Sequence, residues 1–279
     1  MRNYVRLARR SVIGVLFAVG LLGCDFGPKF TAKATRATTK DSTTAKIDAK
    51  TTTGSIAVSG ASTRSNTTII AEFTCGGQTQ QEADERLAKS TLDVTSEPDG
   101  TIVIRASFPT PRQNGDGVAA QVTVPILTGA TLRTNTGSIS VSHADGSIDA
   151  RTNTGNIKIS GCSGEVLARG DTGRIVVSTH TGRVDAATDT GSVAIELTDQ
   201  SAGTVTGETD TGSVSLSVGP AFNGIITTHT GIGSVKLSGD SSRITRSDLQ
   251  KHDGVVTIGS GGEESSLHTD TGSIDINVR

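Results

Sequence analysis

The sequence has no tryptophan, one tyrosine, one methionine and six phenylalanines among its 279 residues. An aromatic-rich globular core is therefore excluded, and any core must be built from Val, Ile, Leu and Ala. The chain also lacks a strong net charge: its formal charge is −2, too small to keep it disordered by self-repulsion. Glycine, in contrast, is abundant, with 34 residues against 6 prolines. Together with many Thr and Ser residues, this composition favours a β architecture.

No apolar run is long enough to span a membrane, because the run over residues 12–22 falls short of the roughly 20 residues that a spanning helix needs. Four arginines precede this run, and Leu21-Leu22-Gly23-Cys24 ends it. This order predicts an export signal over residues 1–23. Its end resembles the bacterial lipobox, in which the cysteine, here Cys24, receives a diacylglycerol and becomes the new N-terminus. A plain signal peptide or an uncleaved anchor is the alternative.

Removal of residues 1–23 would leave 22 basic and 28 acidic residues, a charge of −6. Such a charge does not favour bulk binding to nucleic acid. Residues 24–45 are rich in Thr, Ala and Lys without an apolar period, which predicts a flexible tether after the lipidated cysteine. Cys75 and Cys162 would then lie in an oxidising compartment, where a disulfide between them and two free thiols both remain open.

One motif, close to Thr-x-Thr-Gly-Ser-Ile/Val-x-Ile/Val, recurs along the second half of the chain, with an outlying copy at residues 51–58. Its glycines are 18 or 21 residues apart. Apolar residues occupy the second and fourth positions after each glycine, which is the period of a strand with one buried face. The principal glycines are Gly137, Gly155, Gly173, Gly191, Gly212, Gly233, Gly254 and Gly272.

A weaker half-repeat lies between these glycines and carries small residues at its second inward position: Ala150, Ala168, Ala186 and Gly207. Each repeat is therefore two strands around a narrow core, and stacked repeats bury what a single one cannot. The sequence predicts an all-β fold, a parallel β-solenoid over residues 129–279 with two strands per coil of 18–21 residues. The general rule for parallel crossovers predicts right-handed winding.

Residues 46–128 are less regular, although they contain several β-branched runs. Thr79-Gln80-Gln81-Glu82 is a capping-box pattern and predicts a short helix that ends near Lys89. We expect this region to form an N-terminal β-rich cap that carries one short helix. Such a cap would protect the otherwise open end of the solenoid.

Several features occur together in one order: the lipoprotein signal, Gly-Ser-Ile-x-Val at 54–58, the helix at 80–89, Val-x-Val-Pro at 122–125 and the repeats. In this order, over residues 45–279, the chain resembles the putative-adhesin family of β-strand-repeat bacterial envelope lipoproteins, a domain of unknown function. The resemblance implies a surface or envelope solenoid. Together with the residues it leads us to expect a non-enzymatic protein that acts through its surface, as an adhesin-like or scaffold module. The partners expected are the membrane, through the lipid on Cys24, and an envelope glycan or another envelope protein.

The residue two positions before most principal glycines is Asn or Asp. Asp-Thr-Gly is also the catalytic loop of aspartic proteases, but a protease needs two copies that converge. We expect instead a turn-capping column, in which the side-chain oxygen accepts a backbone N–H; calcium binding between stacked carboxylates is the alternative. The column consists of Asn135, Asn153, Asp171, Asp189, Asp210 and Asp270.

Arg133, Arg151 and Arg169 each lie four residues before a principal glycine, and Lys158 and Arg174 lie on the following strands. Guanidinium groups that repeat at the coil spacing can bind the phosphates or carboxylates of a polymer. We therefore take these five residues as a candidate ladder for an anionic ligand. The alternative is a solvated face on which the arginines pair with carboxylates such as Asp149 and Asp185.

Two further functions stay open, a polysaccharide-active β-helix enzyme and a stress-sensing module that binds a regulatory partner. The enzyme is disfavoured because sugar-binding clefts usually offer aromatic platforms, and the repeats contain only Phe222. The five histidines form no close metal-ligand pair in the sequence, and no nucleophile or nucleotide-binding motif is present. No cofactor, metal or catalytic residue is therefore expected.

The first prediction concerns the anchor. Mass spectrometry of the protein extracted from membranes should find Cys24 at the mature N-terminus with a diacylglycerol on its thiol. The variant Cys24→Ala should keep residues 1–23, because the thiol that accepts the lipid is gone. An unmodified Cys24 at the mature terminus would contradict this prediction.

Overall fold

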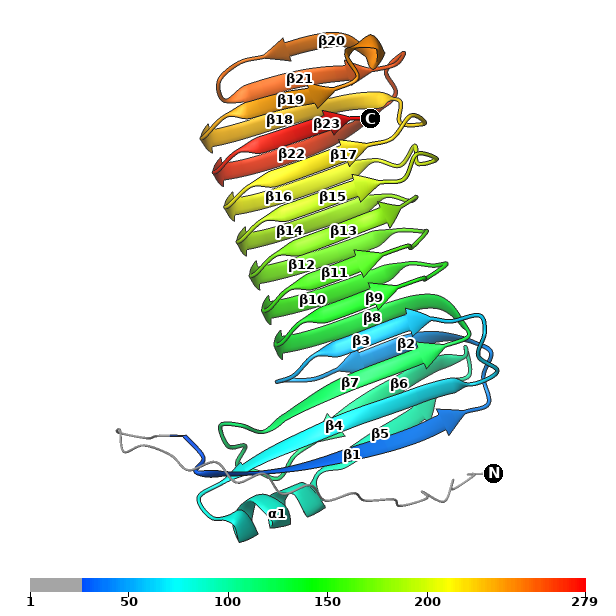
Figure 1. The fold of residues 1–279 in the computed structure, drawn as a ribbon, viewed down its shortest axis with the longest axis vertical. Helices are drawn as coiled ribbons and strands as arrows, with labels where there is room; N and C mark the ends of the chain where they lie inside the picture. Colours follow the sequence, from blue (N-terminus) through cyan, green and yellow to red (C-terminus); the bar gives the residue numbers. More distant parts are fainter. Residues whose placement is uncertain (1–26) are drawn as a thin grey trace.

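A computed structural model describes residues 27–279; the predicted export signal and Cys24 lie outside the described residues. Two long sheets pack face to face and form a rod, with a broader cap at the N-terminal end (Figure 1). No helix in the described part of the chain is both long and apolar enough to cross a membrane. The all-β solenoid predicted from the repeats is confirmed.

The eleven strands of the first sheet, called sheet A, follow in spatial order: β1 (Phe30–Lys40), β4 (Thr67–Gly77), β7 (Gly117–Val124), β3 (Ile56–Gly60), β9 (Ile139–Ser142), β11 (Ile157–Ser160), β13 (Ile175–His180), β15 (Val193–Leu197), β17 (Val214–Val218), β23 (Ile274–Val278) and β19 (Val235–Gly239). The twelve strands of sheet B are β20 (Ile244–Leu249), β21 (Asp253–Ile258), β18 (Gly224–Ile232), β22 (Glu263–Thr271), β16 (Val205–Thr211), β14 (Val184–Thr190), β12 (Val166–Thr172), β10 (Ile148–Thr154), β8 (Ile126–Thr136), β2 (Thr44–Lys50), β6 (Thr101–Ser107) and β5 (Thr91–Ser96).

Each coil is one strand of sheet B, a turn at a principal glycine, and one strand of sheet A. Successive coils pair in parallel and in register, so that equivalent residues lie side by side: Ile157 lies between Ile139 and Ile175. These side chains are almost completely buried. The alternation of apolar and polar residues thus places one continuous aliphatic core between the sheets.

The inward positions of sheet B carry small residues because the space between the sheets is narrow. Ala150, Ala168 and Ala186 are fully buried. At the next coil the equivalent residue is Gly207, where a Cβ would come within 3.0 Å of Val214 Cγ1. Small residues on one sheet therefore accommodate the branched residues of the other.

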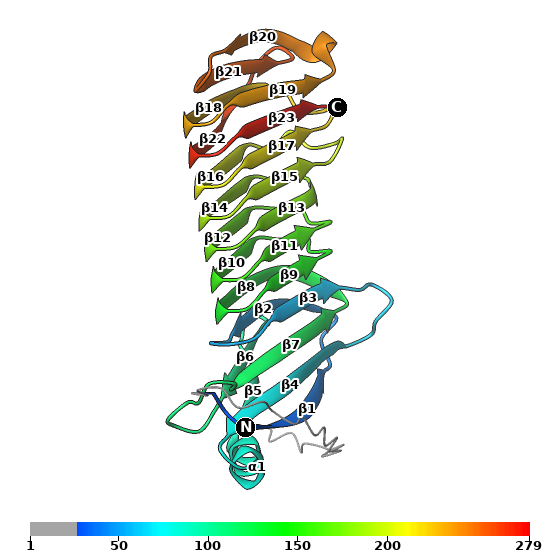
Figure 2. The same cartoon turned by 60° about the vertical axis from the view of Figure 1, so that its left-hand side comes forward.

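The order of the coils differs from the order of the sequence at the C-terminal end. Strands β22 and β23 lie between the coil of β16–β17 and the coil of β18–β19 (Figures 1 and 2). They pair in parallel on both sides. The repeat over residues 251–258 was expected to form a coil, and this is wrong. It is β21, which pairs antiparallel with β18 and β20 in one sheet.

The boundary between cap and solenoid also differs from the prediction. Residues 44–60 were assigned partly to the tether and partly to the cap, but β2 and β3 form the first coil and pair in parallel with β8 and β9. The outlying repeat copy at 51–58 is therefore a true coil. The cap consists of β1, β4, β5, β6, β7 and the helix α1 (Gln80–Lys89).

The prediction of a flexible tether over residues 24–45 is wrong for most of this segment, because residues 30–40 form β1 and residues 44 and 45 begin β2. Strand β1 pairs antiparallel with β4 through eleven residue pairs, so backbone hydrogen bonds order a segment that has little apolar character. Arg36 lies over the ring of Phe73, at 4.4 Å from the centroid, and donates to the carbonyl of Leu87 on α1. An edge strand of Thr, Ala and Lys is thus held between sheet and helix.

The predicted helix forms where the capping box placed it. The Thr79 side chain accepts from the N–H of Glu82 at 3.1 Å, and the Glu82 carboxylate accepts from the N–H of Gln78 at 2.8 Å. On the inner side, Arg86 donates to the buried carboxylate of Asp116 at 2.5 Å, which fixes the helix to the loop before β7. Pairing satisfies a charge that would otherwise be costly to bury.

The second prediction tests the inward phase of the strands. Ile175→Asp should destabilise the protein by about 4 kcal/mol, because it buries a charge without a partner between the sheets. Ser140→Asp, on the exposed face of β9 beside Lys158, should change the stability by less than about 0.5 kcal/mol. Denaturant titrations followed by circular dichroism measure both. Equal losses in the two variants would mean that the assigned phase is wrong.

Candidate binding face

The arginines singled out in the sequence lie side by side on the outer face of sheet B. Arg151 is in register with Arg133 on one neighbouring strand and with Arg169 on the other. Their side chains are 47%, 44% and 37% exposed for Arg133, Arg151 and Arg169. The repeat therefore stacks three guanidinium groups at the strand spacing of about 4.8 Å.

Two more basic residues extend this column toward the cap. Lys50 is in register with Arg133, and Arg105 is in register with Lys50. The sequence carried a signal for Lys50, which lies four residues before Gly54 as Arg133 does before Gly137. Arg105 had none, because β6 lies outside the repeats. We call this column, which runs over five adjacent strands, the basic row: Arg105, Lys50, Arg133, Arg151 and Arg169.

Aspartates of the neighbouring outward column bind the arginines of the basic row. Arg105 contacts Asp48 at 2.6 Å, and Arg169 contacts Asp185 at 2.7 Å. Asp149 accepts from both Arg133 and Arg151, and its hydrogen bond raises the pKa of the Arg151 guanidinium. These pairs orient the guanidinium groups and leave part of each exposed to solvent.

The other two members of the predicted ladder do not join the basic row. Lys158 lies on β11 in sheet A, exposed and beside Ser140 and Val176. Arg174 immediately precedes β13 of the same sheet. The chain passes from sheet B to sheet A at each principal glycine. Residues after that glycine therefore lie on sheet A and not on the face of sheet B that carries the arginines. The five-residue ladder is therefore wrong as a single site.

The predicted turn-capping column is aligned but does not cap the turns. Its members, Asn135, Asn153, Asp171, Asp189, Asp210 and Asp270, are all exposed. In residues 27–279 none of their side chains accepts a hydrogen bond from a backbone N–H. The preceding threonine is buried instead, and its hydroxyl donates to the glycine carbonyl of the adjacent coil, as Thr209 does to Gly191 at 3.0 Å. The short hydroxyl reaches that carbonyl because it points inward, whereas the Asn or Asp points outward.

The geometry of this column bears on the protease and calcium alternatives. Asp171, Asp189, Asp210 and Asp270 occupy equivalent positions on adjacent parallel strands and point the same way, so no two of these loops converge as a protease requires. In the part of the chain that the structure describes, no three His, Cys, Asp or Glu side chains gather as a metal site.

The two cysteines of the described region are buried and free, so the disulfide left open by the sequence does not form. Cys75 lies in β4 of the cap, with its Sγ 3.3 Å from Ser90 Oγ. Cys162 lies in the turn after β11, where its thiol donates to the carbonyl of Ser160 at 3.2 Å. Burial raises the pKa of both thiols, which disfavours the reactive thiolate.

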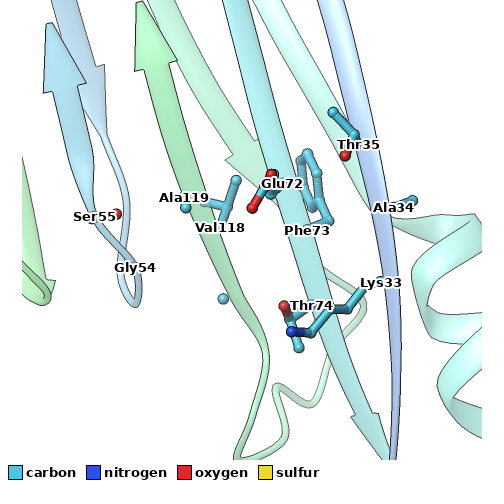
Figure 3. Close-up of a pocket in the computed structure, with 11 residues that line it drawn as sticks. Lys33, Ala34, Thr35, Gly54, Ser55, Glu72, Phe73, Thr74, Val118 and Ala119 are labelled. Atoms are coloured by element: carbon cyan, nitrogen blue, oxygen red, sulfur yellow. The ribbon is translucent and has the colours of Figure 1, made fainter. Parts of the chain in front are cut away.

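Two shallow depressions mark the surface near the cap. One, of about 460 Å³, lies over β1, β4 and β7 and is lined by residues such as Lys33, Glu72 and Thr74 (Figure 3). The other, of about 370 Å³, lies on sheet B next to the basic row and includes Lys46 and Asp48. Glycines at positions 129 and 146 leave room for the second depression. Neither depression contains a nucleophile paired with a general base.

A histidine is also buried in the solenoid. His180, at the end of β13, is fully buried, and its Nε2 lies 3.0 Å from the carbonyl oxygen of Gly164. Desolvation lowers the pKa of this imidazole below 6.5. Burial between the sheets therefore favours the neutral form of the His180 imidazole.

A comparison with solved structures finds proteins that are named as putative adhesins or cell adhesion proteins. A putative cell adhesion protein from Clostridium sporogenes aligns with 88% of this chain and 100% of its own, at 9% identity and a TM-score of 0.34. A putative adhesin from Bacteroides fragilis aligns with 90% of this chain and 100% of its own, at 17% identity and a TM-score of 0.39. A putative adhesin from Parabacteroides merdae aligns with 90% of this chain and 97% of its own, at 11% identity and a TM-score of 0.30.

No family model matches the sequence, and no curated protein matches it. The identities and TM-scores of the solved structures are low, so these names transfer neither a ligand nor an activity to this chain.

The third prediction follows from His180. Its lowered pKa means that the unfolded chain binds one proton more than the folded protein as the pH falls below 6.5. Its contribution to stability is therefore present above that pH and is lost below it. From about pH 7.5 to about pH 5.5, the melting temperature of the wild type should fall further than that of His180→Gln.

The glutamine amide introduced in this variant can still donate to the carbonyl of Gly164 and does not titrate. The carboxyl groups with lowered pKa, of Glu82, Asp99 and Asp240, change their charge at a lower pH than this window. If the two proteins lost the same number of degrees, His180 would not be the titrating group.

Proposed function

We propose that this protein is an exported, lipid-anchored β-solenoid without enzymatic activity that binds a linear anionic polymer of the cell envelope. The polymer lies along the outer face of sheet B and contacts the basic row. In this role the protein acts as an adhesin-like or scaffold module, and the cap faces the lipid anchor that Cys24 would carry. The basic row is the observation that supports this proposal.

The geometry of the basic row suits a polymer better than a small ligand. Five basic residues repeat over five adjacent strands, so the site extends along the rod and has no end wall. Arginine forks bind phosphate or carboxylate oxygens in pairs, and Asp48, Asp149 and Asp185 hold part of each fork in place. An extended chain with repeated negative groups can contact several forks at once, and such multivalent contacts add.

The depression beside the basic row is shallow and open to solvent, and Lys46 adds a further positive charge at its margin. It widens the basic surface toward the cap without enclosing a substrate. A site of this kind excludes little water, so its contacts are mainly ionic and sensitive to salt. These properties suit the binding of a polymer along a surface.

The fourth prediction tests the polymer site. The full chain in a non-ionic detergent should bind teichoic acid or a polyuronate, with an affinity that falls as sodium chloride rises. Arg133→Gln/Arg151→Gln/Arg169→Gln should weaken binding at least about tenfold, because each lost fork removes an ionic contact. Isothermal titration calorimetry measures both proteins, and their thermal melts should differ little because these ion pairs are partly exposed to solvent.

The matched control is Lys158→Gln/Arg174→Gln/Lys236→Gln, which removes the same number of positive charges from the opposite side of the rod. It should bind the polymer like the wild type. If both triple variants lost the same affinity, binding would follow net charge alone. If the wild type bound neither polymer at low salt, the polymer site would be refuted.

A further inference from the structure

A second column of side chains runs beside the basic row on the outer face of sheet B. Each of its members lies two residues after a member of the basic row. Side chains two residues apart on a strand point to the same face and lie about 6.6 Å from each other. Toward the cap, this column consists of exposed residues without charge, and we call these four residues the polar column: Ser107, Thr52, Asn135 and Asn153.

The polar column and the basic row are close enough to contact one ligand. Farther along the rod, His268 and Asp270 occupy the positions equivalent to Arg151 and Asn153. There the imidazole Nε2 lies 3.0 Å from a carboxylate oxygen of Asp270. Side chains at these two positions of a coil therefore reach the same point above the sheet, and a ligand on the arginines also meets the polar column.

The amides of Asn135 and Asn153 are available to such a ligand. Both side chains are exposed, and neither has a hydrogen-bond partner within residues 27–279. An amide donates and accepts hydrogen bonds, as the hydroxyls of Ser107 and Thr52 also do. These are the groups that bind alcohol hydroxyls. The basic row thus has uncharged donors and acceptors at its side.

The same column changes from neutral to acidic at β12. Its further members are carboxylates on β12, β14, β16 and β22: Asp171, Asp189, Asp210 and Asp270. The basic row ends at this place too, because Arg169 is followed by Ala187. Carboxylates repel an anionic polymer. Neutral polar residues therefore accompany the basic row over β6, β2, β8 and β10, which marks these strands as one binding surface.

We propose that the anionic polymer is an acidic polysaccharide, whose carboxylates bind the basic row and whose ring hydroxyls bind the polar column. This inference rests on the proposed function and names the class of its ligand. A uronic acid ring carries a carboxylate on one side and hydroxyls on the other, so a chain of such rings along the rod presents each kind of group to one column. An inorganic polyphosphate carries the charge without the hydroxyls, so the polar column contributes little to its binding.

The fifth prediction compares two polymers, polygalacturonate and linear inorganic polyphosphate, on the full chain in a non-ionic detergent at about 20 mM salt, where ionic contacts are little screened. Asn135→Ala/Asn153→Ala should weaken the binding of polygalacturonate about fivefold or more, because two hydrogen-bonding side chains are lost. Its affinity for polyphosphate should stay within about twofold of the wild type, because every charge of the basic row remains. Isothermal titration calorimetry measures both affinities.

The matched control is Asn156→Ala/Asn277→Ala, which removes two exposed amides from the sheet A side of the rod and should bind both polymers like the wild type. The arginine variant of the fourth prediction should bind both polymers more weakly, because they share the basic row. The acidic polysaccharide would be overturned by a wild type that binds polyphosphate alone. It would also be overturned by an asparagine variant that loses the same factor for both polymers or keeps full affinity for polygalacturonate. These outcomes leave the polymer site standing, whereas a wild type that binds neither polymer refutes the site and this inference together.

Discussion

Neighbouring coils come into close backbone contact at the principal glycines, and the rest of the solenoid depends on this contact. A Cβ at Gly191 or Gly212 would overlap the carbonyl oxygen of the equivalent glycine in the preceding coil. Both glycines have a positive φ, of 141° and 148°, which other residues rarely adopt. A threonine hydroxyl donates to the same carbonyl, as Thr209 does to Gly191, and this hydrogen bond helps to fix the position of each coil relative to the next. Spacing and register follow from this contact.

Because every coil has the same register, a single residue position becomes a line of side chains along the rod. The basic row lies on one such line, which continues beyond Arg169 through Ala187 and Glu208. The chemistry of the face is therefore set by few residues per coil, while the inward residues stay nearly constant. A function that depends on charge, such as binding a polymer, can therefore change without any change in the core.

Much of this was predictable from the sequence, because period and burial are local properties of each repeat. The inward orientation of Ile157 and the capping box at Thr79 could be predicted without knowing which strands lie next to each other. The order of the coils was not predictable, because residues 269–276 match the repeat equally well in any position of the stack. The site was predictable only where the repeat continued: Arg133, Arg151 and Arg169 were found, whereas Arg105 lies on a cap strand outside the period. The ordered β1 was missed because hydrogen bonds to β4, and not apolar burial, hold it.

Because β22 and β23 come last in the sequence but lie inside the stack, the rod cannot be assembled strictly in sequence order. Coils up to β16–β17 can add one after another as the chain is synthesised. The next segment, β18–β19, has no neighbour on its β16–β17 side until residues 263–278 fill the gap between the two coils. The C-terminal end of the rod is therefore completed only after the final residues have been made.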